Sequence, residues 1–198
     1  MRPRRYGDAG QAFPIYITVV GGLLFLAFAY FAVGQAAANR NGAQTAADAA
    51  ALAAAQETRD QLAGKWVEAV LDPTKWQEIF DGKAPGVGDS CWRAHQLAAQ
   101  NDAGNVNCVP VGLLSYRVDL QTNKTVGDSI VPGTEDIRST ASATAVIEPL
   151  CEDAGDDVLP RLSCKDDKNW DLDPDDPTSL PEPEDLFDVH LARPAIDE

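Results

Sequence analysis

The pattern of apolar and polar positions opens with one long uncharged run. Residues 13–33 read FPIYITVVGGLLFLAFAYFAV, and no charged residue lies between Asp8 and Arg40. Twenty-one helical residues span about 31 Å, the thickness of a bilayer core. A chain of this size can hardly bury a helix that is apolar on every side. The pattern therefore predicts a transmembrane helix over 13–33, with Tyr16 and Tyr30 near its two interfaces.

The helical pattern continues beyond this run into an alanine-rich segment. Alanine, the residue with the highest helix propensity, occupies 12 of the 21 positions from 36 to 56. Leu52, Leu62 and Trp66 then recur at helical spacing. The chain is predicted to be helical from about 14 to 71, with residues 34–71 forming an alanine-rich stem. Asn and Gly within 39–42 disfavour helix and mark the place for a bend.

Two shorter helices are expected after the stem. Asp72 can cap the first one, because Pro73 follows it at a position that favours a helical first turn. Trp76 begins the apolar face of this helix. Ser90 can cap the second helix, over 91–100.

Two strands follow the helices. Residues 113–121 and 137–148 alternate apolar and polar side chains with a period of two, which is typical of half-buried strands. These elements predict a small α+β domain over 72–151. The fold class is thus α+β, with a long N-terminal helix in front of a small domain.

Charge divides the chain again. The formal net charge is −15. Residues 152–198 hold 16 acids and 4 bases, whereas residues 1–151 hold 15 acids and 12 bases. The acidic segment is also rich in proline, so we expect an acidic flexible tail over 152–198. A surface this negative argues against nucleic acid as a partner, because phosphate contacts need clustered Lys and Arg.

The basic residues near the apolar run set its orientation. Arg2, Arg4 and Arg5 lie in a short leader, residues 1–12, whereas Arg40 is the one base close behind the run. The positive-inside rule then places the N-terminus in the cytoplasm and the domain outside the membrane. An alternative is a cleaved secretory signal, with the alanines at 36–38 as the cleavage site.

The cysteines agree with this orientation. Cys91, Cys108, Cys151 and Cys164 all follow the apolar run, and an even number of cysteines outside the membrane indicates two disulfides. Four cysteines allow three pairings. We favour the pairing between sequence neighbours, Cys91 with Cys108 and Cys151 with Cys164.

The N-terminal quarter of the chain resembles a known family. The resemblance rests on Gly10 and Gln11 before the apolar run and on the motif QTAADAAALAAA at 44–55 after it. Within the motif the matching residues are Ala47, Asp48, Ala49, Ala50 and Leu52. This segment resembles the TadE/TadG-like proteins of Flp (tight adherence) pilus assembly, most closely the TadG-related branch. The alanine-rich style is similar to that of actinobacterial proteins.

The resemblance has one departure. TadE-type members resemble prepilins, with a glutamate five residues after a glycine, and Ile15 stands at that position here. The TadG-related branch, which often lacks the glutamate, fits better. The resemblance implies a pilin-like helix and a role in assembling or anchoring a Flp-type pilus or related secretion system. Its implied partners are the lipid bilayer and other membrane proteins of that system.

Small residues recur along the stem at a spacing of four. They are Gly34, Ala38, Gly42, Ala46, Ala50 and Ala54. Such a row lets helix backbones approach closely, so it predicts packing against helices of partner proteins. The alternative is a solvated, stiff spacer.

Candidate chemistry is sparse. No Ser, Cys and His constellation suggests a nucleophile, so we expect no enzymatic activity and no cofactor. His95 with Cys91, Cys108 and Cys151 offers a weak zinc hypothesis. The segment DLDPDD at 171–176, with Glu182 twelfth from Asp171, offers a weak calcium hypothesis. A second function hypothesis is a membrane-tethered extracytoplasmic binding domain, unrelated to pili, that contacts cations or cell-wall partners through its acidic tail.

Overall fold

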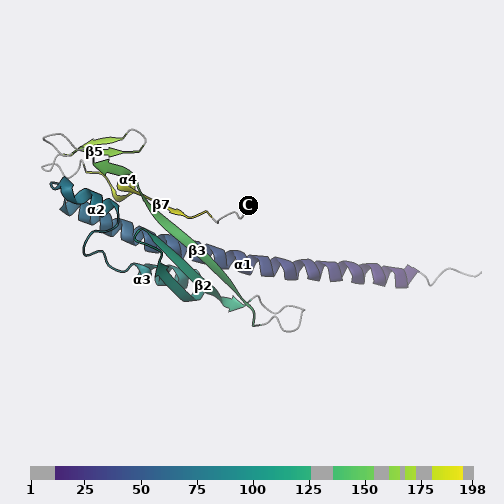
Figure 1. Cartoon of the computed structure of the whole chain (residues 1–198). Coiled ribbons are helices and arrows are strands. Elements are labelled where there is room, and N and C mark those ends of the chain that lie inside the picture. The colour runs from purple at the N-terminus through teal and green to yellow at the C-terminus, as the bar shows by residue number, and fades with distance from the viewer. Residues whose placement is uncertain (1–11, 126–135, 154–160, 166–167, 173–179, 194–198) are drawn as a thin grey trace, which may run out of the picture.

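The computed structural model describes residues 12–125, 136–153, 161–165, 168–172 and 180–193. Its dominant element is α1, Ala12–Glu68, a continuous helix of 57 residues. Figure 1 shows α1 extending far beyond the rest of the fold. The predicted long helix is confirmed, although it passes through residues 39–42 without interruption. It ends near Ala69, whose carbonyl accepts a 2.9 Å hydrogen bond from Trp76 Nε1.

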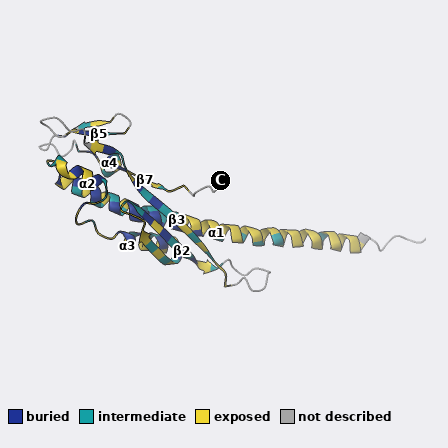
Figure 2. Cartoon of the chain, viewed as in Figure 1, coloured by how far each residue is buried: buried dark blue, intermediate teal, exposed yellow. Residues whose placement is uncertain are grey.

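Helix α1 has two halves with opposite surroundings (Figure 2). No residue from 13 to 42 is buried, whereas one face of 43–69 is fully enclosed. The enclosed residues are mostly alanines: Ala43, Ala46, Ala47, Ala50, Ala51, Ala53, Ala54, Ala55, Thr58, Leu62, Ala63, Trp66 and Ala69. The second half of α1 is therefore the central helix of the folded domain, and the first half stands free of it.

The short helices follow the predicted order. They are the 3-10 helix η1 (Pro73–Lys75), α2 (Trp76–Phe80) and α3 (Cys91–Gln100). Ser90 precedes α3 but makes no side-chain cap. Instead, the Asp89 carboxylate accepts a 3.0 Å hydrogen bond from the Cys91 amide. The Ser90 hydroxyl is buried against Thr58 at 2.6 Å.

The main sheet is antiparallel, with strand order β1-β2-β3-β7. Its strands are β1 (Ala103–Pro110), β2 (Ser115–Thr125), β3 (Arg138–Pro149) and β7 (Phe187–Leu191). The two predicted strands correspond to β2 and β3. Most of the alternating apolar residues are buried on them, namely Tyr116, Val118, Leu120, Ala143, Ala145 and Ile147. Leu114, Ser139 and Ala141 are half-buried, and Ile137 precedes β3 and is exposed.

Helix α1 packs across this inner face, mainly on β2 and β3. Both surfaces carry small side chains, since Ala143 and Ala145 of β3 are buried in the same core as the α1 alanines. Side chains this short on both surfaces let a helix lie close to a sheet. The alanine-rich stem is thus explained by the chain's own domain.

The acidic C-terminal region is more ordered than the sequence suggests. It contributes β4 (Cys151–Asp153), β5 (Arg161–Cys164), β6 (Asn169–Asp171) and α4 (Pro183–Leu186), besides β7. The first three strands form a second sheet in the order β4-β5-β6. Leu162, Leu186 and Phe187 are fully buried. The predicted flexible tail is therefore wrong for these residues, because a few apolar side chains attach the segment to the core despite its acids and prolines.

Candidate functional site

Within the described part of the chain, the first half of α1 is a long apolar surface that no other element covers. Apart from the half-buried Val20, its large apolar side chains are exposed, from 53% for Ile17 to 83% for Tyr30. Among the described residues, α1 is the one helix long and apolar enough to cross a membrane, judged by length and composition. A helix that is apolar on every side and covered by nothing requires an apolar environment.

Asn39 lies at the junction between the two halves. Its Nδ2 donates to the carbonyls of Lys124, at 3.2 Å, and Thr125, at 3.1 Å. Its Oδ1 accepts a 3.3 Å hydrogen bond from the Thr122 hydroxyl. One side chain thus joins the helix to the end of β2. Asparagine disfavours the interior of a helix, and at this position its side chain bonds the sheet.

A second polar contact follows one turn later. Gln44 Nε2 donates to Asp48 Oδ1, at 2.7 Å, and to the carbonyl of Ser142 in β3, at 3.3 Å. Asp48 belongs to the motif that carries the family resemblance. Of the other motif residues, Ala47 and Ala50 are buried, Ala49 is half-buried, and Leu52 packs against the core. Gly10 and Gln11 lie outside the described residues.

The row of small residues is divided between the two halves of α1. Gly34, Ala38 and Gly42 are exposed on the free half. Ala46, Ala50 and Ala54 have no exposed surface and belong to the chain's own core, in which α1 packs on α3, β2 and β3. Close packing of the buried three therefore has an intramolecular cause.

Two disulfides close the domain. Cys91 is bonded to Cys108, linking α3 to β1, and Cys151 is bonded to Cys164, linking β4 to β5. This is the sequence-local pairing. It removes the thiols that the zinc hypothesis needed, and His95 is left as an exposed residue of α3.

A buried set of hydroxyls lies between α1, the start of α3 and the sheet. Thr58 Oγ1 donates to the Tyr116 phenol oxygen at 2.9 Å and lies 2.6 Å from Ser90 Oγ. All three residues are buried. With no histidine or carboxylate among these bonds, the set satisfies polar groups in the core and offers no activated nucleophile.

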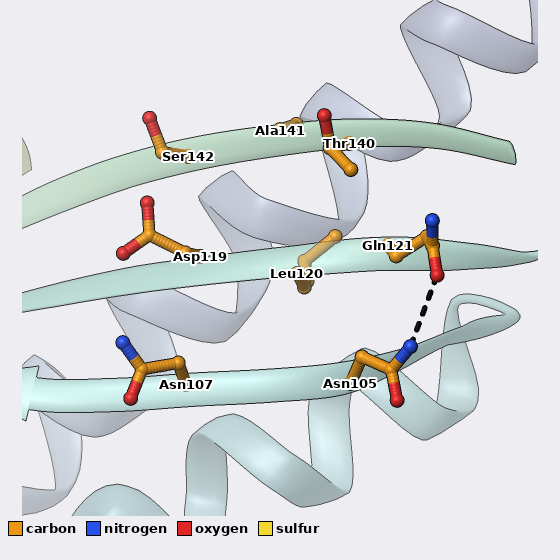
Figure 3. A pocket seen from close by; sticks show the side chains of 8 residues that line it. All are labelled: Asn105, Asn107, Asp119, Leu120, Gln121, Thr140, Ala141 and Ser142. Atoms are coloured by element: carbon orange, nitrogen blue, oxygen red, sulfur yellow. Dashed lines mark hydrogen bonds between the residues drawn. The ribbon is translucent and has the colours of Figure 1, made fainter.

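The outer face of the main sheet carries a shallow polar depression. Its lining residues are Asn105, Asn107, Asp119, Leu120, Gln121, Thr140, Ala141 and Ser142. Figure 3 shows amide, carboxylate and hydroxyl groups spread across three strands, with a 3.0 Å hydrogen bond from Asn105 Nδ2 to Gln121 Oε1. The lining holds one carboxylate and neither histidine nor cysteine, so no acid–base pair is present there.

One exposed group of possible metal ligands was not predicted from the sequence. Glu148, Asp188 and His190 offer ligand atoms within 4.8 Å of one another, on neighbouring strands β3 and β7. The Lys165 ammonium pairs with the Glu148 carboxylate. This hydrogen bond and the charge of Lys165 hold the pKa of Glu148 below its ordinary value of 4.5. The Lys165 ammonium therefore already occupies the place next to Glu148 that a metal ion would take.

The calcium hypothesis falls mostly outside the described residues, since 173–176 belong to the segment that is not described. Glu182 lies at the start of α4, where its amide donates to Asp185 Oδ2 at 3.1 Å. Asp185 in turn pairs with Lys168 at 3.2 Å. Glu182 and Asp185 therefore stabilise the start of α4 and its contact with Lys168.

These features define a class of protein: a disulfide-bonded α+β domain built on the second half of a long helix whose apolar first half is free. Residues 10–57 match the family model described as Putative Flp pilus-assembly TadE/G-like. The match covers about a quarter of the chain and confirms the resemblance for this segment, while the TadG branch and an actinobacterial origin stay predictions. No curated protein and no solved structure matches the chain.

Proposed function

We propose that this protein is a single-pass membrane protein that assembles or anchors a Flp-type pilus or related secretion system, without catalysing a reaction. One observation carries the proposal. The segment similar to the TadE/G-like family, residues 10–57, contains the whole apolar free half of α1 and extends into the domain. The feature shared with the family is thus the anchor together with its attachment to the domain.

The proposed orientation places the N-terminus in the cytoplasm and residues 40–198 outside. Three arginines precede the apolar run, and Arg40 alone follows it closely. Both disulfides lie in the domain on the far side of the run. Disulfides persist in oxidising compartments, which supports the same orientation.

Partner proteins are proposed to pack against the free half of α1. A Cβ added at Gly34 or Gly42 would meet nothing within 4 Å in this chain, so the backbone is open there. Small residues at a spacing of four let helices approach closely within a membrane or next to one. Gly34, Ala38 and Gly42 form the open part of the row.

Site-specific crosslinking in the native cell tests this proposal. Gly34→Leu combined with Ala38→Leu enlarges the open row and keeps helix propensity high. Ala32→Leu with Ala36→Leu adds similar bulk on the opposite side of the same turns. Both variants should stay in the membrane with their disulfides formed.

The first variant alone should lose crosslinks to pilus-assembly membrane proteins and lose surface pili. If both variants crosslink as the wild type does, these residues do not form the partner contact. If no crosslinked partner belongs to a pilus or secretion system, the assembly role is wrong.

A further inference from the structure

The end of the main sheet nearest the free half of α1 is held at a fixed position along the helix. Asn39 bonds the carbonyls of Lys124 and Thr125 and the hydroxyl of Thr122. Thr125 lies opposite Arg138, so the same contact fixes the start of β3. Figure 1 shows the end of β2 and the start of β3 reaching along α1 towards its N-terminal half.

Helix geometry gives the distance of this end of the sheet from the apolar run, measured along the axis of α1. Val33 ends the apolar run, and Asn39 follows six residues later, about 9 Å along the helix axis. The headgroup layer of a bilayer adds roughly 5–8 Å beyond each side of the hydrocarbon core. Ile137 lies one residue before the start of β3, about 3 Å further from the centre of the sheet. If 13–33 span the membrane, Ile137 reaches the headgroup layer.

We infer that this end of the sheet, formed by residues 123–125 and 136–138 and called here the proximal end, rests on lipid headgroups. The inference rests on the proposed membrane anchor and adds a second contact with the same bilayer. Its partner is the phospholipid headgroup layer of the leaflet from which α1 emerges. Lipid is the expected occupant because the proposed anchor and the proximal end belong to one helix and its attached sheet, so both lie at the same leaflet.

The side chains at the proximal end suit a headgroup layer. Ile137 is an apolar side chain that is 51% exposed and can therefore insert at the boundary of headgroups and acyl chains. Arg138 beside it and Arg40 on α1 are exposed cations within reach of lipid phosphates. The proximal end also carries Lys124, paired with Asp102 at 2.6 Å, and the exposed Asp136. This mixture of charges matches zwitterionic headgroups as well as anionic ones.

The consequence is a fixed orientation of the domain on the membrane. A single helix leaves a domain free to tilt, whereas a second contact beside the helix limits the tilt. The proximal end would then set the angle at which the domain meets its partners.

Depth-dependent fluorescence quenching in liposomes tests the inference on the full chain. Ile137→Trp places a reporter at the proximal end, and a nitroxide on the lipid headgroup quenches tryptophan at that depth. Leu113→Trp is the matched control, because Leu113 is likewise exposed but precedes the other end of β2, about 35 Å away. Phe28→Trp, read with lipids brominated in their acyl chains, reports on the anchor itself.

Because the chain has four native tryptophans, quenching is compared with that of the wild type. The inference predicts that the headgroup nitroxide quenches Ile137→Trp more than the wild type and quenches Leu113→Trp no more than the wild type. Adding Asn39→Ala to Ile137→Trp should weaken the quenching, since the proximal end is then released. If Phe28→Trp is quenched but Ile137→Trp is not, the headgroup contact is wrong and the anchor stands. If Phe28→Trp is not quenched, the membrane anchor fails and the inference fails with it.

Discussion

Replacing Ala50 by Leu tests why the stem is so rich in alanine. Ala50 has no exposed surface and lies in the core cluster where α1 meets β3. Leucine adds three carbon atoms at a position that the fold encloses completely. Overpacking of this kind costs about 1–3 kcal/mol of unfolding free energy. Helix propensity does not confound the change, because leucine is nearly as good a helix former as alanine.

Thermal unfolding of the full chain in detergent micelles measures the effect. Trp66 and Trp76, whose rings lie 5.5 Å apart in the core, report on the domain by fluorescence. For a chain of this length, each 1 kcal/mol lowers the melting temperature by about 2–4 °C. Ala38→Leu is the matched control, since Ala38 belongs to the same row of small residues but is exposed.

We expect the melting temperature of Ala50→Leu to lie several degrees below that of the wild type. The melting temperature of Ala38→Leu should equal that of the wild type. Equal melting temperatures for all three proteins would refute close packing between α1 and the sheet. A large loss in Ala38→Leu would instead show that the free half of α1 has a partner within the fold that the structure does not reveal.

Three further outcomes are expected. Replacing Cys91 and Cys108 by serine opens the link between α3 and β1 and should cost about 3 kcal/mol in denaturant titrations, a loss that unchanged midpoints would contradict. By NMR, the pKa of Glu148 should lie below 4.5 and should return towards that value in Lys165→Met. Because this pKa is lower in the folded than in the unfolded state, the ion pair stabilises the fold at pH values above the unfolded pKa. The stabilisation is lost as the pH falls through the folded pKa. The intact protein should resist carbonate extraction from membranes, whereas a secreted species starting near residue 39 would show that the helix is a cleaved signal.

Strong periodicity made part of this fold predictable. Strands β2 and β3 alternate over many residues, so most of their core faces could be assigned from sequence, and the long uncharged run with the alanine-rich segment behind it predicted α1 as a helix. The free half of α1 was likewise evident, because an uncharged run of this length has few other interpretations. These predictions required no knowledge of what packs against each face.

Local irregularity hid other elements. In β1 the backbone at Asn105 has φ of 49°, and the register with β2 shifts between Gly104 and Asn107. Such a bulge breaks the two-residue alternation on which strand prediction depends. Strand β7 does alternate, from Phe187 to Leu191, but it has five residues inside a segment whose acids and prolines favour disorder.

The row of small residues shows what sequence cannot decide. A spacing of four marks one helix face but does not say what covers it. Ala46, Ala50 and Ala54 are buried in the core, whereas Gly34 and Ala38 are exposed, although the sequence treats all five alike. The difference arises because the sheet and α3 pack on the second half of α1 and leave the first half uncovered.

An alanine-to-alanine contact has an energetic consequence for the whole domain. Burial of apolar surface stabilises by about 25 cal/mol per Å², and alanine buries little. Larger side chains must therefore supply stability elsewhere, and they lie towards the C-terminal end of α1, where Leu62, Trp66 and Trp76 are fully buried or nearly so. The opposite end is held by the polar contacts of Asn39 and Gln44. The proximal end is thus held to α1 by hydrogen bonds, and a headgroup layer beside it, as inferred above, would add a further contact at this end of the domain.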